Sequence, residues 1–366
     1  MILPPLIERL QRQSEFLGQA PERALDLSIQ AESCVYTWMQ LAMHWRACGD
    51  ERSALQAWFQ AGLRLPAQWD AYALSTVGLP DAEALRATSA ELAQGRAQWL
   101  KDSLQALRNQ HGSAALFRID RALAGYLGQA RVFSSHPTQQ PKVLYIPGLS
   151  TGGFVDAKRI ELARDLAAAY AAIREEFEYA LREHDPHEPF MGELPQDKAR
   201  DYVSGGALAS WDAIFFDRHG VRYAKTHARY PHTSGVLDAA DRCRIARQSP
   251  ETCFSILQPH TRIEPHHGVT NARLVVHLPL QVPPGCYLEL VGVGRHYWQE
   301  GEVFAFDDTF LHAAENPSDD VRGILLTDAW HPELSAVERE AFAALITTLT
   351  DLESPPCGGL GFTSKA

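Results

Sequence analysis

The chain has 366 residues, 45% of them hydrophobic and 22% charged, and its 34 Lys and Arg against 45 Asp and Glu give a formal net charge of −11. This length and composition are typical of a folded globular protein of two domains and exclude an intrinsically disordered chain. The acidic balance excludes a general nucleic-acid-binding surface, and the lack of an apolar run of roughly 18 residues predicts no membrane span.

The start of the chain and its cysteines indicate the cellular compartment. The sequence opens Met-Ile-Leu-Pro-Pro and turns polar at once, without the basic segment and apolar stretch of a secretion signal. No two cysteines form a C-x-x-C pair, which argues against a zinc knuckle or a disulfide framework. The six are Cys34, Cys48, Cys243, Cys253, Cys286 and Cys357. We therefore predict a cytoplasmic protein with reduced thiols.

Residues 1–135 are predicted to form an all-helical domain, because Ala, Leu, Gln, Glu and Arg recur there at helical spacing. One unit is more specific: W-x-x-L-A-x-x-W from Trp38 to Trp45, Gly49 at a turn, A-x-x-x-W from Ala54 to Trp58, then Ala61 and Pro66. It resembles a tetratricopeptide repeat, in which small residues let two antiparallel helices approach closely. A single unit cannot bury its own face, so we expect it to bind a protein partner or to pack on the rest of the chain. A generic helical hairpin is the alternative.

A domain boundary is predicted between Ser134 and Lys142. The stretch reads S-S-H-P-T-Q-Q-P-K, with two prolines and no apolar residue. We expect a second domain over residues 142–350 and a Pro- and Gly-rich C-terminal tail over residues 351–366.

The second domain changes from helical to strand-like texture after one amphipathic helix, predicted over residues 157–182. Short β-rich runs bounded by Gly, Pro, Asn and Asp follow. The predicted strands span residues 211–216, 273–280, 286–293, 302–306 and 321–328, and a last helix spans residues 335–349. Strands without intervening helices favour an antiparallel sandwich or jelly roll over a doubly wound sheet, so the predicted fold class is α+β.

The residues that carry chemistry lie in three motifs between Ser255 and Leu334. They read S-I-L-Q-P-H-T-R-I-E-P-H-H-G-V-T-N-A-R-L-V-V-H-L-P-L, then E-G-E-V-F-A-F-D-D-T-F-L-H-A-A-E-N, then V-R-G-I-L-L-T-D-A-W-H-P-E-L. Together they resemble the aspartyl/asparaginyl β-hydroxylase family of iron(II)- and 2-oxoglutarate-dependent oxygenases over about residues 142–342. The resemblance implies a double-stranded β-helix, a cupin-like jelly roll. It also implies that His266 in P-H-x-G-x-T-N and His312 in F-D-D-x-F-x-H hold the metal.

The residue types are consistent with such a centre. Imidazole suits iron(II), and a metal that must also take 2-oxoglutarate and dioxygen needs open positions. A facial triad would place a carboxylate at position 268, where Gly268 stands. The resemblance gives two precedents for this gap: the aspartyl hydroxylases, and radical halogenases that fill it with a halide. His267 competes with His266 for the metal, but side chains of neighbouring residues on an extended segment point to opposite sides.

The cosubstrate requires a cation for its distal carboxylate. Arg322 shares a strand face with apolar residues, where an arginine is costly unless it is paired, and its fork matches a carboxylate. The resemblance assigns it the 5-carboxylate of 2-oxoglutarate, with Ser255 adding a hydrogen bond and His277 lying near the 1-carboxylate. A structural pair between Arg322 and Asp328 is the alternative.

The substrate is less well defined by the sequence. Arg273 matches one of two arginines that line the family's peptide site, whereas the second position is Val275 here. We predict a dioxygenase that hydroxylates a C–H bond, foremost the β-carbon of an Asp/Asn-type residue or a related amino acid, which could be carrier-bound. A lipid acyl-chain hydroxylase and a non-catalytic tetratricopeptide-like adaptor are the alternatives.

Overall fold

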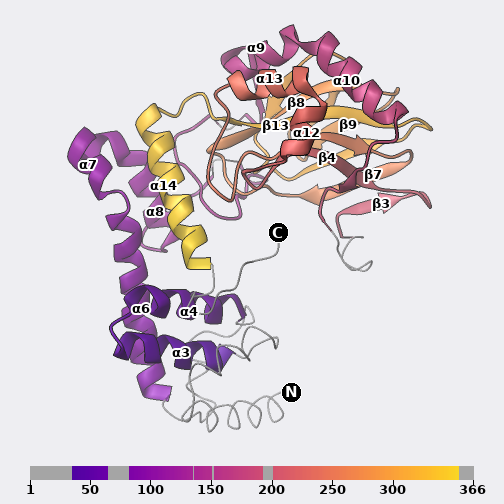
Figure 1. The fold of residues 1–366 in the computed structure, drawn as a ribbon. Helices are drawn as coiled ribbons and strands as arrows, with labels where there is room; N and C mark the ends of the chain where they lie inside the picture. Colours follow the sequence, from indigo (N-terminus) through magenta and orange to yellow (C-terminus); the bar gives the residue numbers. More distant parts are fainter. Residues whose placement is uncertain (1–34, 65–81, 135, 151, 193–200, 354–366) are drawn as a thin grey trace. The chain divides into compact units, whose positions relative to one another are not determined.

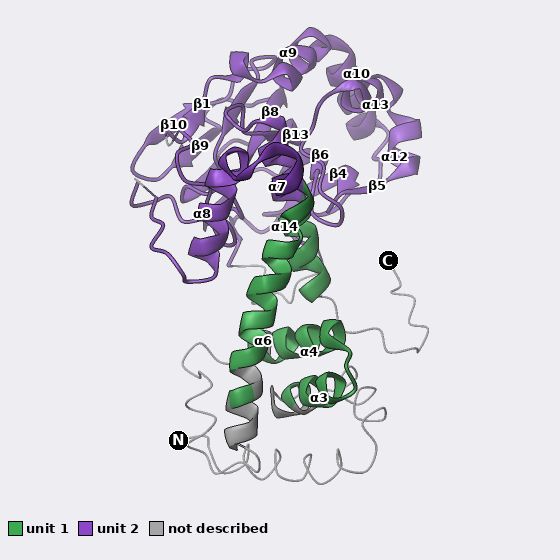
Figure 2. Cartoon of the chain, turned by 90° about the vertical axis from the view of Figure 1, so that its left-hand side faces the viewer, with its two compact units in different colours: residues 1–106, 344–366 green, residues 107–343 purple. Residues whose placement is uncertain are grey.

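The chain forms two compact units in the computed structural model, which describes residues 35–64, 82–134, 136–150, 152–192 and 201–353. Residues 1–106 with 344–366 make one unit, and residues 107–343 make the other (Figure 2). Several features singled out in the sequence lie outside the described residues: the N-terminal Met-Ile-Leu-Pro-Pro, Cys34, Pro66, Cys357 and the end of the chain from Ser354.

The first unit is helical. It contains α3 (Val35–Ala47), α4 (Glu51–Arg64), α6 (Ala82–Asp102) and the end of α14 (Ala336–Glu353). α3 and α4 form the predicted hairpin, with the turn at Gly49, whose φ of 80° is open to glycine without strain (Figure 1). Trp38 and Ala54 are fully buried in the core of this hairpin. The helical pair is therefore present, and its kinship with tetratricopeptide repeats stays a prediction.

The division between the units falls earlier in the chain than the predicted limits of 135 and 142. α7 (Gln105–His111) crosses the division, and α8 (Phe117–Tyr126) lies in the second unit. There Arg118 of α8 forms an ion pair with Glu338 (Nη2–Oε2 2.6 Å) and donates to the Glu333 carbonyl oxygen. α14 also continues to Glu353, so the first residues of the predicted tail are helical.

The helices of the second unit differ in two ways from expectation. The helix predicted over residues 157–182 is a 3-10 turn (Ala157–Arg159) followed by α9 (Glu161–Ala168) and α10 (Tyr170–Arg182). The break at Ala169 lets Leu166 and Ile173 face one core. α12 (Ala224–Arg229) and α13 (Pro231–Ala239) intervene between strands, where none was expected, because their sequence has little apolar periodicity. A 3-10 turn (Ser113–Leu116) precedes α8.

Two antiparallel sheets make up the rest of the second unit. The first has the order β1-β11-β8-β13-β6-β4-β2, with β5 beside β4, and the second has the order β10-β9-β12-β7-β3. The first comprises β1 (Phe154–Val155), β2 (Glu188–Pro189), β4 (Trp211–Arg218), β5 (Val221–Arg222), β6 (Thr252–Leu257), β8 (Arg273–Gln281), β11 (Phe304–Phe306) and β13 (Arg322–Trp330). The second comprises β3 (Val203–Gly205), β7 (Thr261–His266), β9 (Tyr287–Leu290), β10 (Gly294–Tyr297) and β12 (His312–Asn316). From β6 onward the chain passes back and forth between the sheets, which is the predicted double-stranded β-helix in an α+β protein.

Side-chain alternation places one face of the eight-stranded sheet under helices and the other over the second sheet. Leu274 and Val276 of β8 belong to the core shared with α9, α10 and α13, which cover this face (Figure 1). Val275 between them belongs to the core between the sheets. Gly323 of β13 lies directly under α10, because a Cβ there would fall 2.0 Å from Cζ of Phe177. The interior that results is the space in which the site lies.

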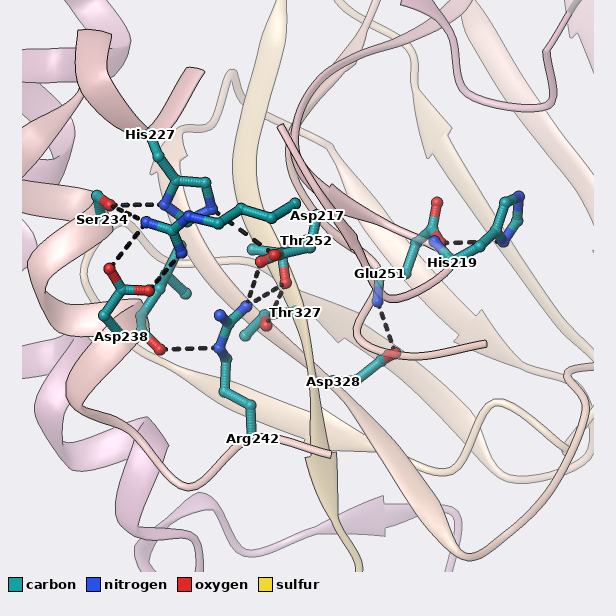
Figure 3. A network of polar contacts seen from close by, with 12 residues as sticks. Asp217, His219, His227, Ser234, Asp238, Arg242, Glu251, Thr252, Thr327 and Asp328 are labelled. Atoms are coloured by element: carbon teal, nitrogen blue, oxygen red, sulfur yellow. Dashed lines mark hydrogen bonds and ion pairs between the residues drawn. The ribbon is translucent and has the colours of Figure 1, made fainter. Parts of the chain in front are cut away.

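A buried charged network ties α12 and α13 to the strands (Figure 3). Arg242 donates to Asp217 (Nη1–Oδ2 2.6 Å) and to Thr252. His227 contacts Ser234 (Nδ1–Oγ 2.6 Å), but its Nε2 lies 3.7 Å from Asp217, beyond hydrogen-bond distance. All five are buried, so this Ser-His-Asp grouping holds elements together and has no access to a substrate. None of the helices in the described parts combines the length and apolar character of a membrane span.

Candidate active site

Two histidines meet on neighbouring strands of the five-stranded sheet. His266 ends β7 and His312 begins β12, and the two residues are direct partners in the register of this strand pair. Their ring centroids lie 4.1 Å apart. The fold thereby brings together two residues that lie 46 positions apart in the chain.

The backbone fixes both imidazoles in the form that binds a metal. Nδ1 of His266 lies 2.8 Å from the Glu264 carbonyl oxygen, and Nδ1 of His312 lies 2.9 Å from that of Phe310. A carbonyl oxygen only accepts, so each Nδ1 carries the proton and each Nε2 keeps its lone pair. Burial lowers the pKa of His266 and lowers the pKa of His312 to about 3. Both rings are therefore neutral at neutral pH.

His267 faces elsewhere. Its Nδ1 lies 2.9 Å from the Thr309 carbonyl oxygen, and its neighbour His266 takes the position opposite His312. The geometry thus distinguishes the two adjacent histidines, which the sequence alone left in competition.

The space beside Gly268 is occupied by a neighbouring side chain. A Cβ there would lie 2.0 Å from Cγ of Asp308, whose backbone oxygen also accepts from the Gly268 amide at 2.6 Å. Within the described residues, no group of three or more His, Cys, Asp or Glu side chains could hold a metal. The pair His266 and His312 would therefore leave most positions of a bound metal open, which fits an iron centre that also takes small ligands.

Arg322 is buried without a carboxylate partner among the described residues. Its Nη1 lies 3.4 Å from both the carbonyl oxygen and Oγ of Ser255, and its Nε has no partner there. Burial lowers its pKa to about 10, which leaves it charged at neutral pH. The alternative pair with Asp328 is absent, because Asp328 bonds to Arg273. An unpaired buried guanidinium is costly, so this site fits an anionic ligand.

Trp211 orients Ser255 and was not anticipated from the sequence. Its Nε1–H donates to Ser255 Oγ at 2.9 Å. With Arg322 as a second donor, both lone pairs of the hydroxyl are engaged, so its O–H is left to donate into the interior. Trp211 precedes Ser255 by 44 residues, and only the pairing of β4 with β6 brings them together.

His277 presents two unpartnered ring nitrogens to the same interior. It is buried, and neither Nδ1 nor Nε2 has a hydrogen bond within the described chain. Burial, and then the charge of Arg322, hold its pKa well below the usual value. Phe304 and Phe306 flank the ring with centroids 5.1 and 5.3 Å away. Together with Arg322 and Ser255 it offers hydrogen-bonding groups of the kind that a dicarboxylate would satisfy.

Arg273 is held between two carboxylates. Its Nη1 lies 2.7 Å from Asp328 and its Nη2 lies 3.3 Å from Asp308. Burial opposes its charge, but these two carboxylates outweigh burial and raise its pKa. Asp328 also accepts from the Glu251 amide (Figure 3). Burial raises the pKa of Asp308 to about 7. The guanidinium is thus positioned by the protein itself and retains further N–H donors.

Sequence comparisons identify relatives of this chain. A profile of the family described as Aspartyl/Asparaginyl beta-hydroxylase matches residues 167–332. Aspartate beta-hydroxylase domain-containing protein 2 of Mus musculus is 32% identical over 255 residues, which are 68% of this chain and 70% of that protein. Aspartyl/asparaginyl beta-hydroxylase of Homo sapiens is 36% identical over 112 residues, 28% of this chain and 15% of that protein.

Solved structures are more distant. A prolyl-4-hydroxylase of Pseudomonas putida covers 50% of this chain and 92% of its own, with 16% sequence identity and a TM-score of 0.25. A score this low supports no conclusion about this chain.

Proposed function

Since the chain belongs to the aspartyl/asparaginyl β-hydroxylase family, we propose that it is an iron(II)- and 2-oxoglutarate-dependent dioxygenase that hydroxylates a substrate C–H bond. The proposal is carried by two observations in one unit: neutral His266 and His312 face each other, and a buried Arg322 has no carboxylate partner in the described chain. When bound, iron and 2-oxoglutarate would supply the oxidising chemistry.

The protein's own residues would bind and orient the metal and 2-oxoglutarate. Nε2 of His266 and of His312 would hold the metal, because both Nδ1 atoms are engaged with backbone carbonyls. Arg322 and the Ser255 hydroxyl would bind the 5-carboxylate of 2-oxoglutarate, and His277 would lie near its 1-carboxylate. The apolar rings around His277 would keep water out of this pocket.

Hydroxylation is proposed in preference to halogenation. The space in which a side chain at position 268 would lie is filled by the Asp308 carboxyl. A halide bound there would displace or oppose that group. Product formed in high chloride should therefore gain one oxygen in mass spectrometry, and a chlorinated product would contradict this choice.

For the substrate, we propose an Asp- or Asn-type residue or a related amino acid, free, in a peptide or on a carrier. Arg273 would lie at the substrate side, where its remaining N–H donors can serve a carbonyl or carboxylate. Its charge is already paired with Asp328 and, in part, with Asp308, so a neutral acceptor would suit it as well as an acid.

Succinate release is the direct test. The full chain is incubated with iron(II) and 2-oxoglutarate without oxygen, then exposed to oxygen with Asp and Asn peptides, free amino acids and acyl lipids in parallel. Substrate-stimulated succinate with an Asp- or Asn-type compound is expected. Stimulation by lipids alone would favour an acyl-chain hydroxylase, and no 2-oxoglutarate turnover under any condition would favour a non-catalytic adaptor.

A further inference from the structure

One buried polar group in the interior of the second unit has no role so far. Trp298 follows β10 directly and is 5% exposed. Its Nε1 is buried and has no hydrogen-bond partner among the described residues. A buried indole N–H usually finds an acceptor, because leaving it unpaired costs free energy.

The position of Trp298 indicates where the acceptor would be. The guanidinium carbon of Arg322 lies 5.0 Å from the centre of its ring, within the range of a cation–π contact. The ring of His277 lies 6.1 Å away between centroids. Trp298 is therefore a neighbour of both residues proposed to hold the ends of the cosubstrate.

Three neighbouring side chains there have an N–H group without a hydrogen-bond acceptor. Arg322 Nε, one ring nitrogen of the neutral His277 and Nε1 of Trp298 each carry an N–H, and none of these has an acceptor within the described chain. A single ligand with carboxylate oxygens would satisfy them together, whereas an apolar ligand would satisfy none.

We infer that Trp298 is a further cosubstrate-binding residue, whose Nε1–H donates to the carboxylate that Arg322 holds while its ring packs against the Arg322 guanidinium. This inference rests on the proposed function. It adds a donor that neither the motifs nor the strand pattern had indicated.

Binding measurements on the full chain test it. Zinc is used in place of iron because zinc is diamagnetic. The affinity for 2-oxoglutarate is then measured by calorimetry in the wild type, in Trp298→Phe and in Trp330→Phe. Phenylalanine keeps a ring against Arg322 but lacks the N–H, so Trp298→Phe should bind roughly ten- to a hundredfold more weakly. Trp330→Phe changes a comparably buried tryptophan that packs on Phe342, and it should bind as the wild type does.

Two further readouts follow ligand binding in the wild type, and the variant serves only to assign the indole resonance. In the ¹⁵N-labelled wild type, the indole resonance that Trp298→Phe removes should move when 2-oxoglutarate is added. With 2-oxopentanoate, which has a methyl group in place of the distal carboxylate, that resonance should stay in place.

The outcomes separate this inference from the proposed function. If the wild type binds 2-oxoglutarate but Trp298→Phe binds it equally well, or the indole resonance does not move, Trp298 is structural and the inference is overturned. If the wild type does not bind 2-oxoglutarate at all, the proposed function falls, and this inference with it.

Discussion

Each histidine of the candidate metal pair is oriented by the backbone carbonyl of the residue two positions earlier, Glu264 for His266 and Phe310 for His312. Because the acceptors are backbone oxygens, truncating a neighbouring side chain removes neither of these two hydrogen bonds. These hydrogen bonds occupy each Nδ1, so a bound metal would have Nε2 alone as its ligand atom on each ring.

His312→Ala should abolish metal binding. The wild type should bind about one iron(II) per chain, and removing one of two protein ligands leaves too few donors to retain it. Metal content after dialysis and 2-oxoglutarate turnover without substrate both measure the loss. His267→Ala is the matched control, because His267 bonds to the Thr309 carbonyl oxygen and should leave metal content unchanged. Full activity of His312→Ala would contradict the assignment of His312 as a metal ligand.

Arg322→Ala should weaken 2-oxoglutarate binding by two decades or more. Truncating one partner of a buried charge pair costs roughly 3 to 5 kcal/mol. Arg322→Lys keeps the charge without the fork and should fall in between, and Ser255→Ala should cost about 1 to 3 kcal/mol. Anaerobic titration of the iron form, followed by its charge-transfer absorption, gives the affinities. Unchanged binding in Arg322→Ala would make this arginine structural.

Gly268→Ala should destabilise the protein by roughly 1 to 3 kcal/mol, because its Cβ would fall 2.0 Å from the Asp308 carboxyl carbon. For the same reason Gly268→Asp should fail to create a third metal ligand. Urea unfolding measures the stability. Gly235→Ala in α13 is the control, since nothing lies within 4 Å of its Cβ, and it should be neutral or slightly stabilising. Equal stabilities of the two variants would contradict the close packing.

Among the elements, α13 depends on a side chain of another helix. Glu176 of α10 accepts from the amides of His232 and Thr233 at 2.8 Å each and from the Thr233 hydroxyl at 2.6 Å. The carboxylate thereby caps the first turn of α13, whose own N-cap residue Tyr230 offers no side-chain bond.

Glu176→Ala should therefore lower the free energy of unfolding by about 2 to 4 kcal/mol, since three hydrogen bonds are lost together. Glu178→Ala on the same helix is the matched control. It removes an exposed pair with Arg174 and should cost about 0.5 kcal/mol or less. Similar values for both variants would show that the cap contributes little.

The strands that the sequence predicted best are buried on both faces. β4, β8 and β13 are mostly apolar and are buried at nearly every position, so the sequence of each was enough to predict a strand. β7 and β12, which hold the two histidines, read T-R-I-E-P-H and H-A-A-E-N and lack that pattern. Their strand character comes from pairing across the five-stranded sheet, which no local window contains.

The residues of the candidate site also differ in whether the sequence predicted them. His266, His312, Ser255, His277 and Arg322 lie in motifs, and the structure brings the two histidines together and Ser255 beside Arg322. Trp211 and Trp298 lie outside those motifs and reach the interior only through the fold. Arg273 was found by its motif, yet its two carboxylate partners follow from contacts across strands.

At the scale of the whole molecule, the two compact units indicate where the chain could be cut into pieces that fold alone. A chain of residues 107–343 should be soluble and retain 2-oxoglutarate turnover without substrate. A chain of residues 141–343 loses α8 and the partner of Glu338, so it should be less stable by roughly 2 to 4 kcal/mol. Thermal unfolding and succinate release compare the two. If residues 107–343 are insoluble, the second unit does not fold alone.

The pairing of β7 with β12 also determines at which stage of synthesis and folding the candidate metal site can form. His266 and His312 are register partners only after the 45 residues between them have folded across both sheets. Contacts of such long sequence separation form late, after the entropy of closing the loop has been overcome. On the ribosome the two histidines would meet only after β12 has emerged, so the proposed iron site would form on strands that are already paired.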